Sequence, residues 1–265
     1  MDIIIAGPGR AGGSLALAAA GAGHHIVGVV SRSGAMADQF AQLEYEAALP
    51  GADLLVVAVG DSHISEVANR LAPHIKDIAG AVHLSGYASV RLLSPLEAQG
   101  VEVGSFHPLQ TLPSATVGAR SLAGSWVGVT AESGLRASLW ALATTLEMKP
   151  FQLADEQKPA YHAAASAASN FVVAALGVAE RLFAAAGVPF EAALPLTRQV
   201  VENAYELGGR EALTGPVARG DWSTVEGQLA AARAVEMSDA YLELVRATAH
   251  LAGTELPSSV LRHSR

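Results

Sequence analysis

A glycine-rich loop near the N-terminus has the spacing of a phosphate-binding turn. The apolar, β-branched run Asp2–Ala6 leads directly into Gly7-Pro8-Gly9-Arg10-Ala11-Gly12, and a helical pattern follows. In a strand–turn–helix unit, Gly7 allows a tight turn, Gly9 lets the backbone approach a pyrophosphate, and Gly12 lets the helix pack on the strand. The helix N-terminus favours a phosphate through its free N–H groups and dipole. We predict that this loop binds a dinucleotide; the alternative is a glycine-rich turn without a ligand.

The end of the second predicted strand indicates which dinucleotide. His25–Val30 is followed by Ser31, Arg32 and Ser33, and no acidic residue occurs before Asp38. A site for NAD usually places an Asp or Glu here to hold the ribose 2′-hydroxyl. An arginine flanked by two hydroxyls is suited to a 2′-phosphate instead. This pattern predicts NADP(H), although Arg32 as a solvated loop residue is the alternative.

Two further strand ends are expected at the same edge of the sheet, because ligands of doubly wound sheets lie beyond the carboxyl ends of the strands. The loops concerned contain Val59, Gly60 and Asp61 after the third strand, and Ser85 and Gly86 after the fourth. We expect them to line the ribose and nicotinamide side of the cofactor. Asp61 and Ser62 are both candidates to cap the following helix. We expect Ser62 to cap it and the backbone of Val59 and Gly60 to face the cofactor.

Polar side chains at four-residue spacing mark the start of a long Ala-rich helix. Lys158, His162, Ser166 and Asn170 fall on one face, because a helix has about 3.6 residues per turn. Lys158 or His162 is a candidate proton donor, and Asn170 is a candidate to orient Lys158. The alternative is a hydrogen-bonded stripe between helices, or a wet cleft without catalysis.

Candidate substrate-binding residues lie in two loops. His107, followed by Gln110 and Thr111, comes after the fifth strand, where the histidine would meet a carbonyl or carboxylate or would only fix the loop. Thr214 and Arg219 lie in a loop of the C-terminal part, where Arg219 is a candidate carboxylate anchor in its own or a partner subunit. Equally, Arg219 pairs with Asp221, or Asp221 caps the next helix.

These residues must be positioned by two parts of the chain with different patterns. Over residues 1–150, short apolar runs alternate with helical patterns, which predicts an α/β fold with a doubly wound, Rossmann-type parallel sheet. The expected strands are Asp2–Ala6, His25–Val30, Asp53–Val59, Gly80–Leu84, Val101–Phe106 and Trp126–Thr130, with Lys149–Leu153 as a last strand or a linker. The expected helices are Ala11–Ala22, Met36–Leu43, Ile64–Ile75, Val90–Gln99 and Gly134–Glu147.

Residues 151–265 carry no strand pattern and predict an all-α domain, so we divide the chain near Phe151. The expected helices are Asp155–Gly187, capped by Asp155, and then Phe190–Leu207, Thr224–Arg233 and Glu236–Ala252.

Composition excludes several classes of protein. The 265 residues contain no cysteine, which removes disulfides, thiolate metal sites and a cysteine nucleophile. The net charge of −8 without a basic run argues against nucleic-acid binding. No basic leader opens the chain, and the apolar stretch around Phe171–Ala179 is shorter than the ~20 residues of a membrane span. We expect a cytoplasmic protein without a membrane partner. No metal site is predicted, because His and carboxylates lack ligand spacing.

The motifs together resemble one family across nearly the whole chain: Rossmann-like proteins with a C-terminal helical domain of unknown function 2520. The matching segments are Gly7–Gly12, Ser31–Ser33, Leu84–Gly86, His107–Thr111, Lys158–Ala165, Ser169-Asn170, Leu213–Pro216 and Arg219–Asp221. More distantly, the layout is similar to the 6-phosphogluconate and β-hydroxyacid dehydrogenases, pyrroline-5-carboxylate reductase, prephenate dehydrogenase and ketopantoate reductase.

The resemblance implies hydride transfer between NADP(H) and a small-molecule substrate bound between the domains, and a homodimer formed through the helical domain. In β-hydroxyacid dehydrogenases a Lys followed closely by Asn does the proton work; here Lys158 matches, but His162 stands four residues on and Asn170 comes later. The expected activity is reduction of a C=O or C=N bond, with a 2-oxo acid such as ketopantoate as one possible substrate and a cyclic imine acid as its rival. A deazaflavin-dependent NADP reductase is a third possibility. The alternative is a non-catalytic NADP(H)-binding sensor or scaffold.

Overall fold

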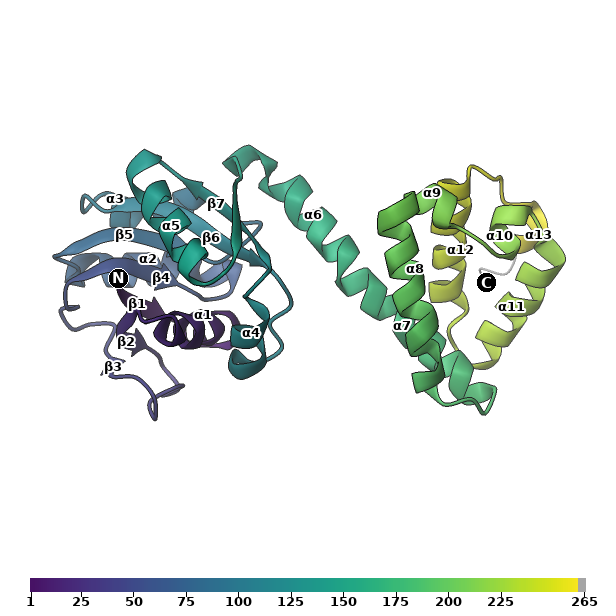
Figure 1. Cartoon of the computed structure of the whole chain (residues 1–265), viewed down its shortest axis with the longest axis horizontal. Coiled ribbons are helices and arrows are strands. Elements are labelled where there is room, and N and C mark those ends of the chain that lie inside the picture. Colours follow the sequence, from purple (N-terminus) through teal and green to yellow (C-terminus); the bar gives the residue numbers. More distant parts are fainter. Residues whose placement is uncertain (262–265) are drawn as a thin grey trace. The chain divides into compact units, whose positions relative to one another are not determined.

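The computed structural model describes residues 1–261, which form two compact units, Met1–Ser166 and the described residues from Ala167 onward. The division that we expected near residue 150 lies before this boundary, within the last strand of the sheet (Lys149–Gln152). The first unit therefore also contains the beginning of the long Ala-rich helix. Figure 1 labels the elements of both units.

The first unit is built on an eight-stranded sheet with the order β3-β2-β1-β4-β5-β6-β7-β8. Neighbouring strands run parallel except for β6 and β7, which pair antiparallel. The predicted doubly wound sheet is confirmed, and the antiparallel pair is an addition to it. The strands are β1 (Asp2–Ala6), β2 (His25–Val30), β3 (Gln42–Leu43), β4 (Ala52–Val57), β5 (Ile78–His83), β6 (Glu102–Leu109), β7 (Trp126–Ala131) and β8 (Lys149–Gln152).

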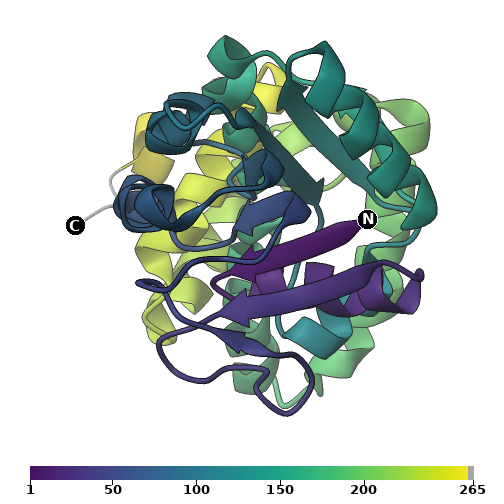
Figure 2. The ribbon, with the colours of Figure 1, turned by 90° about the vertical axis from the view of Figure 1, so that its left-hand side faces the viewer.

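Helices cover both faces of this sheet because its strands alternate apolar side chains between two cores. The helices and turns are α1 (Arg10–Gly21), η1 (Asp61–His63), α2 (Ile64–Leu71), η2 (Ala72–His74), η3 (Val90–Leu93), α3 (Ser94–Glu97), α4 (Ala115–Ser121) and α5 (Ser133–Thr145). Figure 2 shows α2 and α3 on one face, and α1 and α5 on the other.

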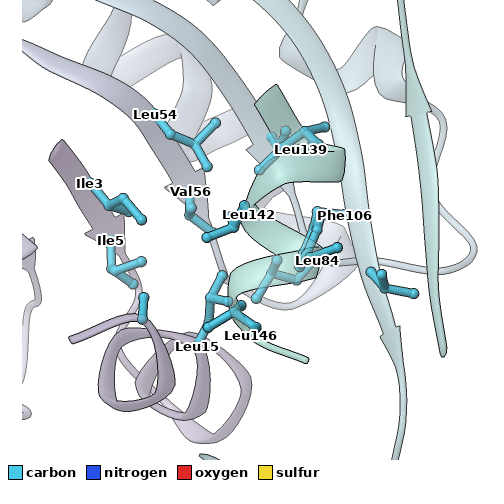
Figure 3. Close-up of a cluster of buried hydrophobic side chains, with 14 of the residues drawn as sticks. Ile3, Ile5, Leu15, Leu54, Val56, Leu84, Phe106, Leu139, Leu142 and Leu146 are labelled. Carbon is cyan, nitrogen blue, oxygen red and sulfur yellow. The ribbon is translucent and has the colours of Figure 1, made fainter. Parts of the chain in front are cut away.

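Alternate residues of one strand belong to different cores. Ile3 and Ile5 of β1 pack with Leu15 of α1 and Leu142 of α5 (Figure 3). Ile4, which lies between them, packs on the opposite face against the residues that surround α2. Both faces of β1 are therefore buried against apolar side chains.

The helix predicted over Met36–Leu43 is wrong. This stretch forms turns in which Met36 has a positive φ of 62°, and Gln42 and Leu43 then pair with β2 as strand β3. A helix of eight residues is marginal by itself. Leu43 instead packs over Gly28, where a Cβ atom would lie 2.7 Å from the leucine side chain.

The second unit is helical in the part of it that the structure describes, as predicted. Its elements are α7 (Asn170–Ala185), η5 (Phe190–Ala192), α8 (Ala193–Leu207), α9 (Gly209–Ala212), α10 (Pro216–Arg219), α11 (Trp222–Ala234), α12 (Ser238–Ala252) and α13 (Ser258–Leu261). Val225 and Leu229 of α11 pack against Leu242 and Val245 of α12 in its core. The short helices α9 and α10 replace part of the predicted loop.

The long predicted helix is divided into η4 (Asp155–Gln157), α6 (Lys158–Ala168) and α7, with Ser169 between the two α-helices at φ −124°. The expected cap at Asp155 is wrong, because Ala154 occupies the N-cap position and the Asp155 carboxylate bonds elsewhere. By length and composition, Asp155–Ala185 is long and apolar enough to cross a membrane. One such helix is weak evidence for a membrane span.

Candidate active site

The glycine loop has the geometry that its spacing predicts. Gly7 has φ +91°, and a Cβ atom there would lie 2.8 Å from the Ala58 carbonyl oxygen. A Cβ at Gly12 would lie 2.4 Å from the Gly7 oxygen, so the start of α1 packs closely on the loop. No atom lies within 4 Å of the Cβ position of Gly9, which leaves this side of the loop open.

The open side of the loop offers hydrogen-bond donors. The Gly9 N–H donates to Gly7 and the Gly13 N–H to Gly9, whereas the N–H groups of Arg10, Ala11 and Gly12 have no acceptor within residues 1–261. Three free donors at a helix N-terminus suit an anion. The buried Pro8 holds the loop against the unit, while Gly9 and Arg10 are exposed.

The loop after β2 lies beside the glycine loop, because the Gly7 N–H donates to the oxygen of Val30, the last residue of β2. The Ser31 hydroxyl accepts from the N–H of Ala35 at 3.2 Å and lies 3.3 Å from the Ser33 hydroxyl. Arg32 is exposed between them. A guanidinium and two hydroxyls are thus available next to the predicted pyrophosphate loop.

The loops after β4 and β5 lie at the same edge. Val59 and Gly60 lead into η1, whose N-cap is Gly60, so the expected cap at Ser62 is wrong. Ser85 closes a tight turn after β5, in which its hydroxyl accepts from the N–H groups of Tyr87 and Ala88. Gly86 follows in this turn.

Gly86 provides room for the ring of His107. A Cβ atom at Gly86 would lie 2.7–2.9 Å from three atoms of this imidazole. His107 comes from β6, and its Nδ1 lies 2.7 Å from the Tyr161 hydroxyl of α6. The two rings meet edge to face at 5.4 Å between centroids. Residues from β6, α6 and the loop after β5 therefore form one polar cluster.

Burial controls the protonation of this pair. Burial, and then the charge of His162, lower the pKa of His107 to about 4. Burial raises the pKa of Tyr161 to about 12. Both groups are therefore neutral at neutral pH, which leaves the phenol as a hydrogen-bond donor.

His162 stands next to this pair, with its ring centroid 6.2 Å from that of His107 and 6.0 Å from that of Tyr87. Asp61 lies close enough to raise the pKa of His107 against the effect of burial. The structure thus brings three predicted site residues, His107, His162 and Asp61, to one place.

Lys158 is buried and already paired. Its ammonium donates to the Ala88 oxygen at 2.8 Å and lies 3.0 Å from a carboxylate oxygen of Asp155. Burial lowers the pKa of Lys158, and Asp155 opposes that shift. The same carboxylate accepts from the Val90 N–H at 3.1 Å and from the Ser89 hydroxyl at 2.5 Å. These contacts fasten the first turn of α6 to the segment after β5.

The other predicted site residues lie apart from this cluster or in the second unit. The Gln110 side chain accepts from the Thr111 N–H at 2.8 Å, and both residues are exposed after β6. Asn170 begins α7. Thr214 and Arg219 are exposed. Asp221 caps α11 by accepting from the N–H of Thr224 at 3.3 Å, as the simpler interpretation expects.

The sequence patterns did not indicate Tyr161 as a site residue or Asp155 as the partner of Lys158. Both lie within one turn of Lys158, at three residues on either side. Residues three apart on a helix are neighbours on its surface, as residues four apart are. Their partners Ser89, Val90 and His107 are distant in sequence, so no local pattern could identify the pairs.

Family comparisons agree with this architecture. Residues 1–108 match the Rossmann-like domain family, and residues 125–248 match the family described as domain of unknown function 2520. Residues 1–108 thus form a Rossmann-like domain. The chain joins this domain to a domain of family 2520, as the motifs predict. No match was found among curated protein sequences.

Solved structures extend the likeness. A Bacteroides fragilis protein, provisionally assigned as an NADP oxidoreductase, is 26% identical with a TM-score of 0.81, over 94% of this chain and 98% of its own. A reductive aminase from Aspergillus terreus, solved with NADPH and ethyl levulinate, is 19% identical with a TM-score of 0.66, over 100% and 99%. Pyrroline carboxylate reductase from Plasmodium falciparum, solved with NADP, is 12% identical with a TM-score of 0.59, over 94% and 98%. For the last two, the likeness is one of fold.

Proposed function

We propose that this protein is an NADP(H)-dependent oxidoreductase that reduces a C=O or C=N bond of a small carboxylate substrate. The observation that carries the proposal is the glycine loop, with three free N–H groups at Arg10–Gly12 and with Arg32 in the adjoining loop. The cluster around His107 and Tyr161 supplies proton-transfer groups at the carboxyl ends of strands in the same unit. An NADP oxidoreductase assignment and NADP-bound structures among the neighbours support the same conclusion.

The cofactor would be held by the residues that the sequence analysis singles out. The backbone of Gly7–Gly12 would bind the pyrophosphate, and Ser31–Ser33 would bind the 2′-phosphate. Val59, Gly60 and Asp61, with Ser85 and Gly86, would line the ribose and nicotinamide. When bound, NADPH would supply the hydride, and this chain would supply binding, orientation and the proton.

The substrate class rests on reaction chemistry and on the neighbours. One neighbour reduces pyrroline carboxylate by name, and another is a reductive aminase, so both C=N and C=O acceptors belong in the search. His107, Gln110, Thr111, Thr214 and Arg219 are the candidate substrate-binding residues. A 2-oxo acid such as ketopantoate is one specific candidate.

The first experiment is a fluorescence titration with NADPH and with NADH. We expect tighter binding of NADPH, and Arg32→Ala should weaken it about tenfold or more, because a hydrogen bond to a charged group contributes roughly 1.5–3 kcal/mol. Arg91→Ala, which removes another exposed arginine of the same unit, is the control. Equal or tighter binding of NADH would reject the NADP preference.

The same preparation tests catalysis against a panel of 2-oxo acids and cyclic imines, with NADPH oxidation as the signal. Turnover of a panel member supports the reductase and names its substrate class. Tight NADPH binding without turnover of any member would favour the alternative, an NADP(H)-binding sensor or scaffold.

We also propose that the protein is a homodimer formed through the helical domain. Large apolar side chains are exposed on α7 and α8, among them Phe171, Val173, Leu196, Val200 and Tyr205. Within Asp155–Ala185, only 6% of the apolar 18-residue segment is buried inside one chain. A contiguous exposed apolar surface usually marks an interface, and a second copy would cover these faces.

A further inference from the structure

We propose that Tyr161 is the proton donor of the reduction and that His107 holds its phenol in the donating orientation. This inference rests on the proposed reductase function. It assigns the proton to a residue that local sequence patterns do not single out, and it makes Lys158 a positioning residue.

Two contacts hold the Tyr161 side chain, and a third holds its partner His107. The Tyr161 oxygen lies 2.7 Å from Nδ1 of His107. The ring of Phe151, from β8, packs against the Tyr161 ring at 5.8 Å between centroids. The His107 ring in turn lies against the backbone of Gly86. A donor whose ring and oxygen are both held loses little freedom on meeting a substrate, which is what general acid catalysis requires.

The hydrogen-bond direction decides whether the phenol is available. The lowered pKa of His107 keeps its imidazole neutral near pH 7, so the ring carries one hydrogen. When that hydrogen is on Nδ1, the imidazole donates to the Tyr161 oxygen and the phenolic hydrogen is free for a substrate. The charged or titratable groups that act on His107 are His162 of α6, Lys158 of α6 and Asp61 of η1.

Lys158 is less suited to the donor role. Two of its three ammonium hydrogens are directed to the Ala88 oxygen and the Asp155 carboxylate, and the residue is fully buried. It lies three residues before Tyr161, one helical turn away. Its contacts therefore hold the turn of α6 from which the phenol projects.

The substrate carbon would accept the hydride that bound NADPH supplies and form a C–H bond, while the π bond of the C=O or C=N group breaks and its electron pair moves to the heteroatom. The heteroatom takes the proton from the Tyr161 oxygen. The phenolate that remains accepts the Nδ1–H hydrogen bond of His107 and recovers a proton from water before the next turnover.

The test compares Tyr161→Phe with Tyr87→Phe, which removes the hydroxyl of a neighbouring ring that is 56% exposed. We expect Tyr161→Phe to lower kcat by ~10²–10⁴ while the affinity for NADPH stays the same. Tyr87→Phe should retain the wild-type kcat. Full turnover by Tyr161→Phe, with an active wild type, would overturn the inference and leave the proposed function standing.

A second readout does not depend on activity. Two-bond ¹H–¹⁵N spectra of the histidines, with His107 assigned through the His107→Gln variant, report which nitrogen carries the hydrogen. We expect Nδ1–H in the wild type and a shift toward Nε2–H in Tyr161→Phe. Nε2–H in the wild type would overturn the inference, because the phenol would then donate to His107. A wild type that binds NADPH but reduces no panel member would instead reject the proposed function, and the assignment of Tyr161 with it.

Discussion

His83 ends β5 with its side chain fully buried. Its Nδ1 accepts the N–H of Ser85 at 3.2 Å, so the neutral ring carries its hydrogen on Nε2. Burial, and then the charge of Lys158, lower the pKa of His83 to about 3. The folded protein thus excludes a proton that the unfolded chain binds readily near pH 6.

This difference in pKa predicts that the free energy of unfolding already decreases at pH values above those at which carboxylates titrate. Between the unfolded pKa of about 6.5 and the folded pKa of about 3, the unfolded state binds more protons, so stability falls as the pH falls. The loss is about 1.4 kcal/mol per pH unit for this one histidine. Urea unfolding at pH 7, 6 and 5 measures it.

The matched variants are His83→Gln and His25→Gln, the second of which changes an exposed histidine. We expect a shallower dependence of the free energy of unfolding on pH in His83→Gln, and the wild-type dependence in His25→Gln. Parallel curves for His83→Gln and the wild type would show that His83 does not control the acid sensitivity.

At the scale of elements, one buried ion pair fastens α6 to the segment that follows β5. Although burial raises the pKa of Asp155, hydrogen bonds from Ser89, Val90 and Lys158 bring it below its ordinary value. The ionised Asp155 carboxylate therefore contributes stability above the ordinary pKa of an aspartate, and this contribution is lost as the pH falls through the lowered value.

Removing the lysine should destabilise the first unit. Lys158→Met leaves a partly buried carboxylate without its cation, and we expect a loss of roughly 3 kcal/mol in the free energy of unfolding. The exposed Lys76 provides the control, because Lys76→Met should change stability by less than about 0.5 kcal/mol. Chemical unfolding monitored by tryptophan fluorescence gives both values. A Lys158→Met protein as stable as the control would mean that the pair does not hold α6.

At the scale of the whole molecule, the apolar faces of α7 and α8 predict self-association. Leu196 is 64% exposed on α8, and a charge there would be buried in a dimer without a partner. Leu196→Asp should therefore shift the protein toward monomer in sedimentation velocity at micromolar concentration. Val117→Asp, on α4 of the first unit, should leave a dimer. A monomeric wild type would rule out the proposed homodimer.

The sequence by itself determined the layers of the first unit and the helical character of the second. Apolar runs and Gly7–Gly12 placed β1, the loop and α1, because period and turn chemistry are local properties. It failed at Met36–Leu43, where pairing with β2 decided the structure. It also could not place the antiparallel β6–β7 pair, since strand direction depends on partners elsewhere in the chain.

Only the tertiary structure decided which polar residues act together. The sequence indicated that His107, Lys158 and His162 could take part in catalysis. It did not indicate that Tyr161 forms a hydrogen bond with His107 or that Asp155 forms an ion pair with Lys158. These pairs join residues of β6 or the segment after β5 to residues of α6, and no spacing along the chain encodes them. Burial then shifts the pKa values of the cluster, because desolvation depends on what packs around a group and not on its neighbours in sequence.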